Sequence, residues 1–347
     1  MKWLFAKRGS NLISLIFIVS LVYGAFFTGS NSSNNKKHTT TQLLMGTLVS
    51  ITTWGVEDKK ESKAVADAFL EIARVESLMS SHKKSSQVSL INLKQSQIVD
   101  KELLELIKEA QRIKKLSNGA FDLGLGKLIT MWGFSTDNPP NKPPEDTEIA
   151  SWLNEFKEGD GIAISEKNNS ISITKQAIAL DLGGIAKGYA IDRAIVSLKK
   201  SGVQNALVNA GGDLRGIGKK GDKPWRVGIQ HPRKQDKLIV ATQWSNGQNV
   251  DMAMVTSGDY ERFFIYKEKR YHHILNPKNG YPAKSGLQSV SVQTNSATLA
   301  DGLSTAFFVL GEKASKELLK QIEDVEILIV RSDGTHWQSK GFRGEWL

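Results

Sequence analysis

The sequence contains no cysteine, and this absence removes several kinds of site at once. A disulfide framework, a thiol nucleophile, an iron–sulfur cluster and a cysteine-ligated zinc ion all need that residue. We also expect no lipid anchor attached to cysteine. Histidine is scarce, with six scattered residues in 347, which argues against a histidine metal cluster. A bound metal is therefore expected to be a hard cation held by oxygen atoms.

Common nucleotide-binding and hydrolase motifs are missing as well. Gly218-Lys219 lacks the earlier glycine and the following Ser or Thr of a P-loop, and the glycine-rich stretch 211–218 does not form G-x-G-x-x-G. Neither H-E-x-x-H nor G-x-S-x-G occurs. Any nucleotide chemistry must therefore use other segments.

Acidic residues are absent from the first 42 positions, which hold five of the Lys and Arg residues. Half of the formal charge of +10 is therefore concentrated there, and residues 43–347 carry 41 basic against 36 acidic side chains. No dense basic stripe interleaved with aromatic residues stands out in that part. We expect a modestly basic surface and no nucleic acid among the partners.

The N-terminus has the pattern of an export segment. Lys2, Lys7 and Arg8 precede an apolar run over 12–27, as in a secretory signal. Residues 1–30 are predicted to be a cleaved signal peptide or an uncleaved signal anchor, and the short run leaves both open. We expect an exported protein, periplasmic or on the outer face of the cytoplasmic membrane, with membrane attachment only through this segment.

Residues 31–42 have the composition of a polar Ser/Thr/Asn/Lys linker, so we expect the folded domain to cover 43–347. The apolar pattern there predicts an α+β fold with antiparallel sheets, packed helices and one dominant domain. Helices are predicted over 61–79, 101–116, 185–199, 296–310 and 314–323. Strands are predicted over 44–53, 162–165, 170–174, 177–181, 206–209, 225–229, 238–242, 252–256, 263–266, 270–275, 289–293, 325–330 and 335–338.

Glycine and polar residues concentrate in four islands, of which the first two suit a nucleotide. In 118–134, glycines would let the backbone approach a flat ligand beside Phe121, although a glycine turn beside a packed aromatic explains the same pattern. In 181–190, a strand leads into a helix whose N-terminus, with Lys187, suits an anion. Asp181 could hold a ribose or ring nitrogen, or simply cap that helix.

The third island collects three strand ends, at 209–213, 256–260 and 271–277. His272 and His273 would point to opposite faces of an extended segment, so only one can face a site. A histidine there could take a proton from a hydroxyl, and a lone surface histidine is the alternative.

The fourth island, 298–305, lies on a predicted helix. Asp301 and Thr305 are four positions apart and share one face, which suits Mg²⁺ together with a backbone carbonyl and phosphate oxygens. The alternative is an aspartate near a helix start and a threonine bonded back to the backbone.

Together the islands resemble the ApbE family of FAD:protein FMN transferases from about residue 43 to the C-terminus. The matching segments are MGT at 45–47, GAFD at 119–122, DLGGIAKGYA at 181–190, NAGGDLRGIG at 209–218, TSGDYERFF at 256–264, HILNPKNGYP at 273–282 and SATLADGLSTAFFVLG at 296–311. The resemblance implies a T-fold-like ApbE core as a single catalytic domain, Mg²⁺ dependence and FAD as substrate. Such enzymes transfer FMN from FAD through a phosphoester bond to a Ser or Thr of a target flavoprotein and release AMP.

The resemblance also implies roles for individual residues. His273 would be the base for the target hydroxyl, and His82, which stands where many relatives have an aromatic residue, would stack less well on the isoalloxazine or adenine ring. A second departure is the missing cysteine near residue 25. The metal would be held by the carbonyl of Gly184 and the side chains of Asp301 and Thr305. The remaining FAD contacts would be Met45, Gly119, Ala120, Phe121, Asp181, Lys187 and Ile274.

Two other activities would use the same residues: a metal-dependent FAD pyrophosphatase that gives FMN and AMP, and a non-catalytic FAD-binding protein. The implied targets are subunits of membrane redox complexes or extracytoplasmic flavoproteins, carrying a motif similar to D-G-x-S/T-S/G-A-T. Residues 301–307 come near this motif, but we interpret them as the metal site and not as a target for self-modification.

Overall fold

The computed structural model describes residues 36–135, 142–157, 160–244 and 250–347. The predicted export segment, residues 1–30 with the apolar run 12–27, lies outside these ranges. Within the described ranges, no helix has the length and hydropathy needed to cross a membrane.

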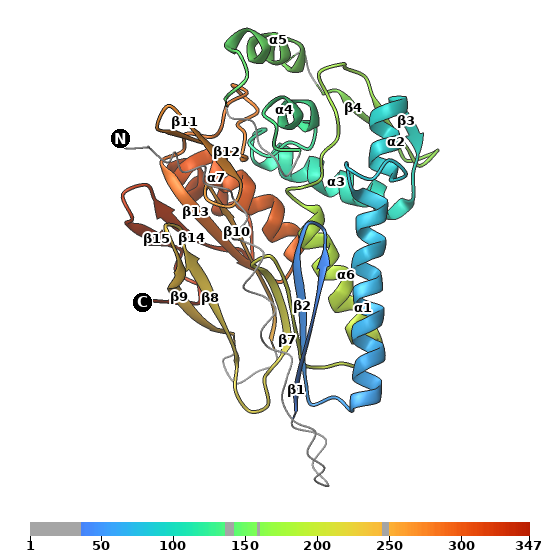
Figure 1. Ribbon diagram of the computed structural model, residues 1–347, viewed down its shortest axis with the longest axis vertical. Coiled ribbons are helices and arrows are strands. Elements are labelled where there is room, and N and C mark those ends of the chain that lie inside the picture. Colours follow the sequence, from blue (N-terminus) through green and yellow to red (C-terminus); the bar gives the residue numbers. More distant parts are fainter. Residues whose placement is uncertain (1–35, 136–141, 158–159, 245–249) are drawn as a thin grey trace, which may run out of the picture. The chain divides into compact units, whose positions relative to one another are not determined.

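An eight-stranded antiparallel sheet organises the described residues (Figure 1). In order across the sheet, the strands are β1 (Lys37–Leu44), β2 (Thr47–Trp54), β6 (Ala206–Ala210), β7 (Asp213–Gly218), β10 (Val250–Gly258), β13 (Leu287–Thr294), β14 (Glu326–Arg331) and β15 (His336–Gln338). All residues of β13 are buried, so this strand has packed layers on both of its faces. The predicted α+β class with antiparallel sheets is confirmed.

Three helices pack together over one face of this sheet: α1 (Asp58–Met79), α6 (Ala186–Lys200) and α7 (Ala297–Leu319). Successive side chains of a strand point to opposite faces of the sheet, and Ala253 and Val255 of β10 face this helical core. Gly311 interrupts α7 with φ 76° and ψ 171°, a left-handed backbone that favours glycine. The break accounts for the two helices predicted in this region.

The other face of the sheet packs on a smaller one, formed by β8 (Trp225–His231), β9 (Lys234–Trp244) and β16 (Glu345–Trp346). Met254, between the two β10 residues named above, points into this second core with the fully buried Trp244. The central sheet is therefore covered by helices on one side and by strands on the other.

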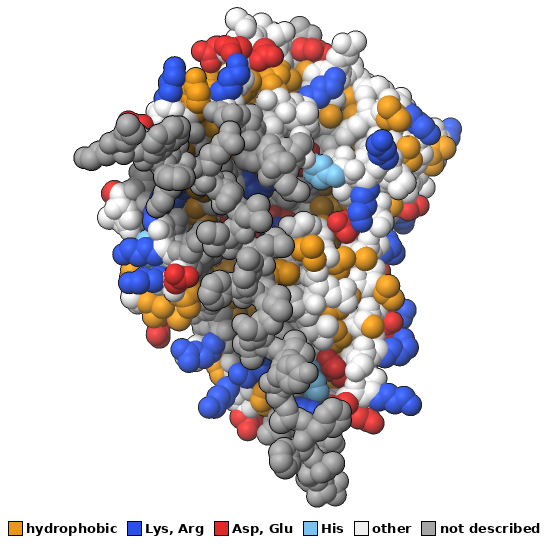
Figure 2. Space-filling view, viewed as in Figure 1, with side chains coloured by type: hydrophobic (Ala, Val, Ile, Leu, Met, Phe, Trp, Pro, Cys, Tyr) orange, Lys and Arg blue, Asp and Glu red, His pale blue; other side chains and the backbone are white. Residues whose placement is uncertain are grey.

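Further elements extend one end of the domain. Helix α3 (Lys101–Leu116) coincides with its prediction, and its apolar residues recur with helical spacing on the buried face. The other elements are α2 (Gln87–Lys94), β3 (Ser96–Ile98), α4 (Gly126–Met131), α5 (Asp146–Phe156), β4 (Ile162–Ser165), β5 (Ser170–Ile173), β11 (Phe263–Tyr266) and β12 (Lys269–His272). Figure 2 shows acidic side chains gathered at the α5 end of one face, with Lys and Arg dispersed around its rim.

Two predictions of local structure are wrong. The predicted linker 31–42 is a strand from Lys37 onward, because consecutive threonines suit a β-strand, and Thr39 and Thr52 face each other across the hairpin with their hydroxyls 3.0 Å apart. The strand is mostly exposed, so it carries no apolar pattern. The predicted strand 177–181 forms only one bridge, because the Asn92 side chain binds both the N–H and the C=O of Leu180.

Candidate active site

The site lies where the first turn of α6 crosses α7. The backbone N–H of Gly188 donates a hydrogen bond to Oδ2 of Asp301 at 2.9 Å. A Cβ atom on Gly188 would come within 2.1 Å of the carbonyl oxygen of Ala297 and 2.8 Å of Cβ of Asp301. Only glycine allows this approach, which places the Asp301 carboxylate at the N-terminal end of α6.

One turn further along α7, Thr305 faces the residues that precede α6. A Cβ atom on Gly184 would lie 3.5 Å from Oγ1 of Thr305 and 3.1 Å from the Phe121 ring. Thr305 Oγ1 also lies 3.2 Å from Oγ of Ser257. The structure thus brings the three predicted metal ligands, Gly184, Asp301 and Thr305, to one side of α7.

A buried ion pair adjoins these residues. Nζ of Lys187 lies 2.5 Å from Oδ2 of Asp213, and Oδ1 of Asp213 accepts a hydrogen bond from the backbone N–H of Thr256 at 3.2 Å. Burial alone would lower the pKa of Lys187, but the charges of Asp213 and Asp301 outweigh it and raise that pKa. Lys187 is therefore held as a cation.

The pKa of Asp301 is also shifted, because this side chain is buried near another carboxylate. Burial and the negative charge of Asp213 raise the pKa of Asp301 to about 7, against the opposing effects of Lys187 and the Gly188 N–H. No three histidine, aspartate or glutamate side chains cluster as a metal site in the residues described. One buried carboxylate, one hydroxyl and one carbonyl still make an oxygen donor set that suits Mg²⁺, and a cation there would favour the ionised form of Asp301.

The predicted flavin contacts come from turns around this centre. Helix α3 is followed by a turn at Asn118 and Gly119, both with positive φ. In this turn the Ser117 hydroxyl accepts a hydrogen bond from the N–H of Phe121 at 3.1 Å. Ala120 and Phe121 are thereby fixed and buried, with the Phe121 ring against Gly184.

Met45 occupies a left-handed position in the turn between β1 and β2 and packs partly against the core. Asp181 accepts hydrogen bonds from Oγ of Ser81 at 2.9 Å and from the N–H of Gly183 at 2.8 Å. It therefore orders the turn before α6 without capping its first residues. His82 follows Ser81 and is exposed.

The paired histidines point in different directions, as the alternation predicted. His272 is buried, with Nε2 3.1 Å from the carbonyl oxygen of Ala283 and its ring edge-on to Phe308. His273 is partly exposed, and its Nδ1 lies 3.2 Å from the carbonyl oxygen of Arg262. A carbonyl can only accept, so Nδ1 carries the proton of the neutral ring and Nε2 is left with its lone pair.

The pKa of His273 supports a neutral imidazole. Burial, His272 and nearby cations, including Lys187, lower it to about 3. The ring therefore has the form of a base across the neutral pH range. Ile274 is buried directly after it and binds Ala283 through the backbone, which fixes the segment.

The structure also identifies site residues that the sequence left without a role. Asp213 was part of an island, but nothing in the local pattern signals its pairing with Lys187. Tyr260 and Glu261 also lie near this centre, and burial raises the pKa of both side chains. The island 256–260 contains Tyr260, and the family-like segment at 256–264 contains both residues.

In residues 301–307, which come near the target motif, the hydroxyls of Ser304 and Thr305 are hydrogen-bonded within the protein. Ser304 is fully buried and donates a hydrogen bond to the carbonyl oxygen of Asp301, and Ser257 lies 2.8 Å from its Oγ. These contacts support the interpretation of residues 301–307 as part of the site.

Comparisons with known proteins agree on one family. Residues 45–329 match the model of the ApbE family. The FAD:protein FMN transferase of Vibrio cholerae is 33% identical to this chain over 285 residues, which cover 80% of this chain and 82% of that protein. The FAD:protein FMN transferase of Haemophilus influenzae is 32% identical over 270 residues, which cover 75% of this chain and 76% of that protein.

Solved structures give the same result. The crystal structure of the ApbE protein from Thermotoga maritima matches with a TM-score of 0.78 and 35% identity, covering 88% of this chain and 97% of that one. The flavin transferase ApbE from Vibrio cholerae matches with a TM-score of 0.73 and 26% identity, covering 88% and 98%. The similarity extends over nearly the whole length of both solved proteins.

Proposed function

Because the chain belongs to the ApbE family, we propose that it is an FAD:protein FMN transferase that moves FMN from FAD to a Ser or Thr of a target protein. The observation that carries this proposal is the crossing of α6 and α7. It gathers a cationic lysine, an oxygen donor set and the Phe121 ring at one place, within electrostatic reach of a neutral histidine.

The chemistry needs a base, a positive environment and a bound nucleotide. His273 would take the proton of the target hydroxyl at Nε2 while the hydroxyl oxygen bonds to the phosphorus of the FMN half. The bond between that phosphorus and the bridging oxygen breaks, and AMP leaves with the bridging oxygen. Lys187 and the N-terminus of α6 would offset the negative charge of the pyrophosphate.

Metal dependence is part of the proposal. Asp301, Thr305 and the carbonyl of Gly184 would hold Mg²⁺, which when bound would neutralise charge on the pyrophosphate. Phe121, Met45 and Ile274 would border the flavin or the adenine. Asp181, fixed by Ser81 and Gly183, would bind a ribose hydroxyl or a ring nitrogen.

The predicted export segment supports a proposal about location, and the family resemblance supports one about the acceptor. We propose that the enzyme acts outside the cytoplasmic membrane, after export by residues 1–30, on redox-complex subunits or extracytoplasmic flavoproteins. N-terminal sequencing of the protein from fractionated cells tests this. A mature chain starting near residue 30 in the periplasm indicates cleavage, an intact N-terminus in the membrane indicates an anchor, and a purely cytoplasmic protein contradicts export.

One incubation separates the possible reactions. The protein is mixed with FAD, Mg²⁺ and an acceptor domain that carries the flavinylation motif, with an acceptor whose motif Ser or Thr is replaced by Ala as the control. Mass spectrometry should find an FMN adduct on the motif residue and equimolar AMP. Free FMN with an unmodified acceptor would instead indicate a pyrophosphatase, and unchanged FAD a binding protein.

A further inference from the structure

The N-terminus of α7 is capped by a carboxylate from another helix. Ser296 caps it locally, since its Oγ accepts a hydrogen bond from the N–H of Leu299 at 3.2 Å. Asp192 of α6 supplies a second and larger cap. Only 14% of its side chain is exposed.

Both oxygens of Asp192 are used. Oδ1 accepts from the N–H of Ala297 at 2.9 Å and from Nη1 of Arg215 at 2.6 Å. Oδ2 accepts from the N–H of Thr298 at 3.0 Å, from its Oγ1 at 2.6 Å and from Oγ of Ser296 at 3.0 Å. One negative charge therefore satisfies two of the free N–H groups of the first turn of α7, where the helix dipole favours an anion.

This cap and the Asp301 contact join the same two helices. Asp192 lies one turn after Gly188 on α6, and Asp301 lies one turn after Ala297 on α7. The two contacts run in opposite directions, since Asp192 of α6 accepts from α7 and Asp301 of α7 accepts from Gly188. A pair of bonds one turn apart fixes both the sliding and the rotation of α7 on α6.

We propose that Asp192 is a positioning residue for the cation site: it sets where Asp301 and Thr305 stand relative to Gly184 and Lys187. Asp192 hydrogen-bonds to α7 at its first turn and not at these groups, although its charge is among those that raise the pKa of Asp301. Its positioning effect would pass through the backbone of α7, and Thr298→Val tests this effect with that charge in place. Arg215 in turn holds the Asp192 carboxylate and also bonds to Asp251 of β10. Asp251 is paired with Arg215 and Lys199 and caps no helix, so it provides a matched control.

Because a cation site is part of the proposed function, on which this inference rests, the experiment measures cation binding directly. Mn²⁺ is titrated into the full chain and free Mn²⁺ is followed by electron paramagnetic resonance. The variant Asp192→Asn keeps the shape of the side chain but loses its charge and one acceptor. We expect it to bind Mn²⁺ about tenfold more weakly, equivalent to about 1.4 kcal/mol.

Two further readouts separate positioning from general loss of structure. FAD binding in EDTA, measured by flavin fluorescence, should stay within about twofold of wild type, which corresponds to less than 1 kcal/mol. Hydrogen exchange should rise in the first turn of α7. Thr298→Val removes the hydroxyl that donates to Asp192 while keeping the shape of the side chain, and it should weaken Mn²⁺ binding about threefold. If Asp192→Asn does not fold, this variant alone tests the positioning role. Asp251→Asn should leave Mn²⁺ binding unchanged.

Failure of the proposed function and failure of the positioning role give different results. If the wild-type chain does not bind Mn²⁺, the metal part of the proposed function fails and the role of Asp192 with it. If the wild-type chain binds and both Asp192→Asn and Thr298→Val bind equally well, the positioning role is overturned while the proposed function stands. Equal weakening in Asp251→Asn also overturns it.

Discussion

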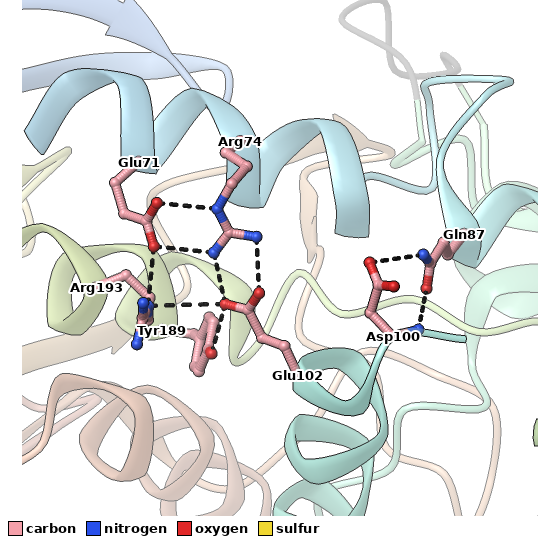
Figure 3. A network of polar contacts seen from close by, with 7 residues as sticks. All are labelled: Glu71, Arg74, Gln87, Asp100, Glu102, Tyr189 and Arg193. Atoms are coloured by element: carbon pink, nitrogen blue, oxygen red, sulfur yellow. Dashed lines mark hydrogen bonds and ion pairs between the residues drawn. The ribbon is translucent and has the colours of Figure 1, made fainter. Parts of the chain in front are cut away.

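Two charged clusters share helix α6 but shift the pKa of a carboxylate in opposite directions. In the first, which we call the Arg74 network, Arg74 bonds Glu71 and Glu102 at 2.7–2.9 Å, and Arg193 and Tyr189 complete the set (Figure 3). These contacts, led by Arg74, lower the pKa of Glu71 to about 2 and also lower that of Glu102. Every carboxylate there faces a cation.

The second cluster, Lys187 with Asp213 and Asp301, contains two buried carboxylates and one lysine. Burial and the charge of Asp213 raise the pKa of Asp301 in spite of Lys187 and the Gly188 N–H, so its ionised form is less favoured here than in water. The Arg74 network ties α1 and α3 to α6 and pairs each of its carboxylates with a cation, whereas the Lys187 cluster would gain stability from the proposed cation. This contrast separates a structural charge cluster from a functional one.

The largest effect is expected from removing the Asp301 carboxylate of the Lys187 cluster. Asp301→Ala should reduce FMN transfer about a thousandfold or more, because the donor set loses its only charged oxygen. In-gel flavin fluorescence of the acceptor measures transfer, and Mn²⁺ binding should be lost in parallel. Asp333→Ala, an exposed aspartate far along the chain, is the control. Full transfer by Asp301→Ala would remove the metal role.

His273→Ala should retain FAD binding and lose transfer about a hundredfold to a thousandfold, as expected for a missing general base. Stopped assays with saturating FAD and acceptor measure the rate constant, and FAD affinity comes from flavin fluorescence. His336→Ala, at an exposed position, serves as the control.

The pH profile gives a second view of His273. A base must be unprotonated, so its activity rises as pH passes upward through its pKa. With that pKa at about 3, the group should impose no decline in rate from about pH 8 down to about pH 5. The profile is measured at saturating Mg²⁺, which favours the ionised form of Asp301, because protonation of that ligand would also lower the rate. Under these conditions, a rate that falls with a midpoint near pH 6.5 would show that His273 titrates normally or that another base acts.

Asp213→Ala tests the ion pair itself. Lys187 would lose its partner while remaining partly buried, so we expect the free energy of unfolding to fall by about 2 kcal/mol and transfer to fall about tenfold. Urea denaturation and the transfer assay measure the two effects. Unchanged values in both would show that the pair contributes neither stability nor function.

Arg74→Ala breaks the Arg74 network and should affect stability alone. The residues are partly exposed, so solvent screening limits the loss to about 1–2 kcal/mol at pH 7, and transfer should stay within about twofold. Lys63→Ala, an exposed member of a single ion pair, is the matched control.

The sign of the pH dependence follows from the lowered pKa. Glu71 contributes stability above its ordinary pKa of 4.5, and the contribution disappears as pH falls toward about 2. Wild type and Arg74→Ala should therefore converge in urea midpoint as the pH is lowered from 7 toward 3. A difference that stays constant with pH would exclude the carboxylates as its source.

His82→Phe lies outside both clusters and should have the smallest effect. A better stacking surface should tighten FAD binding about twofold to threefold without changing stability. Equilibrium binding in EDTA is the measurement, with His82→Ala beside it. Identical affinities for both variants would show that this position does not contact FAD.

Local patterns explain which parts of the fold could be predicted. The helix at Lys101–Leu116 has a continuous apolar stripe, and the strands at Ile162–Ser165 and Phe263–Tyr266 have β-branched or aromatic residues, so these were found with their bounds. β1 is almost entirely polar, so it lacks the alternating apolar pattern that predicts a strand. The short helices α2, α4 and α5 were missed, since six to eleven residues give few helical repeats.

The site shows a different limit. Its residues are predicted from the resemblance of whole sequence segments to the ApbE family. The structure brings three of them, Gly184, Asp301 and Thr305, together. The pairing of Lys187 with Asp213 and the cap of α7 by Asp192 join residues 26 and 105 or more positions apart. No periodicity encodes such contacts, because they depend on how the helices cross.

The strand β1 has a mechanical consequence. It begins at Lys37, directly after the N-terminal region, and ends beside Met45, which is predicted to border the bound FAD. Eight extended residues span roughly 26 Å. A tether attached upstream of Lys37 would thus pull on the sheet about one strand length away from the reacting groups. The hydrogen bonds between β1 and β2 would carry this force. The site could then face an acceptor while the chain is held by its opposite end.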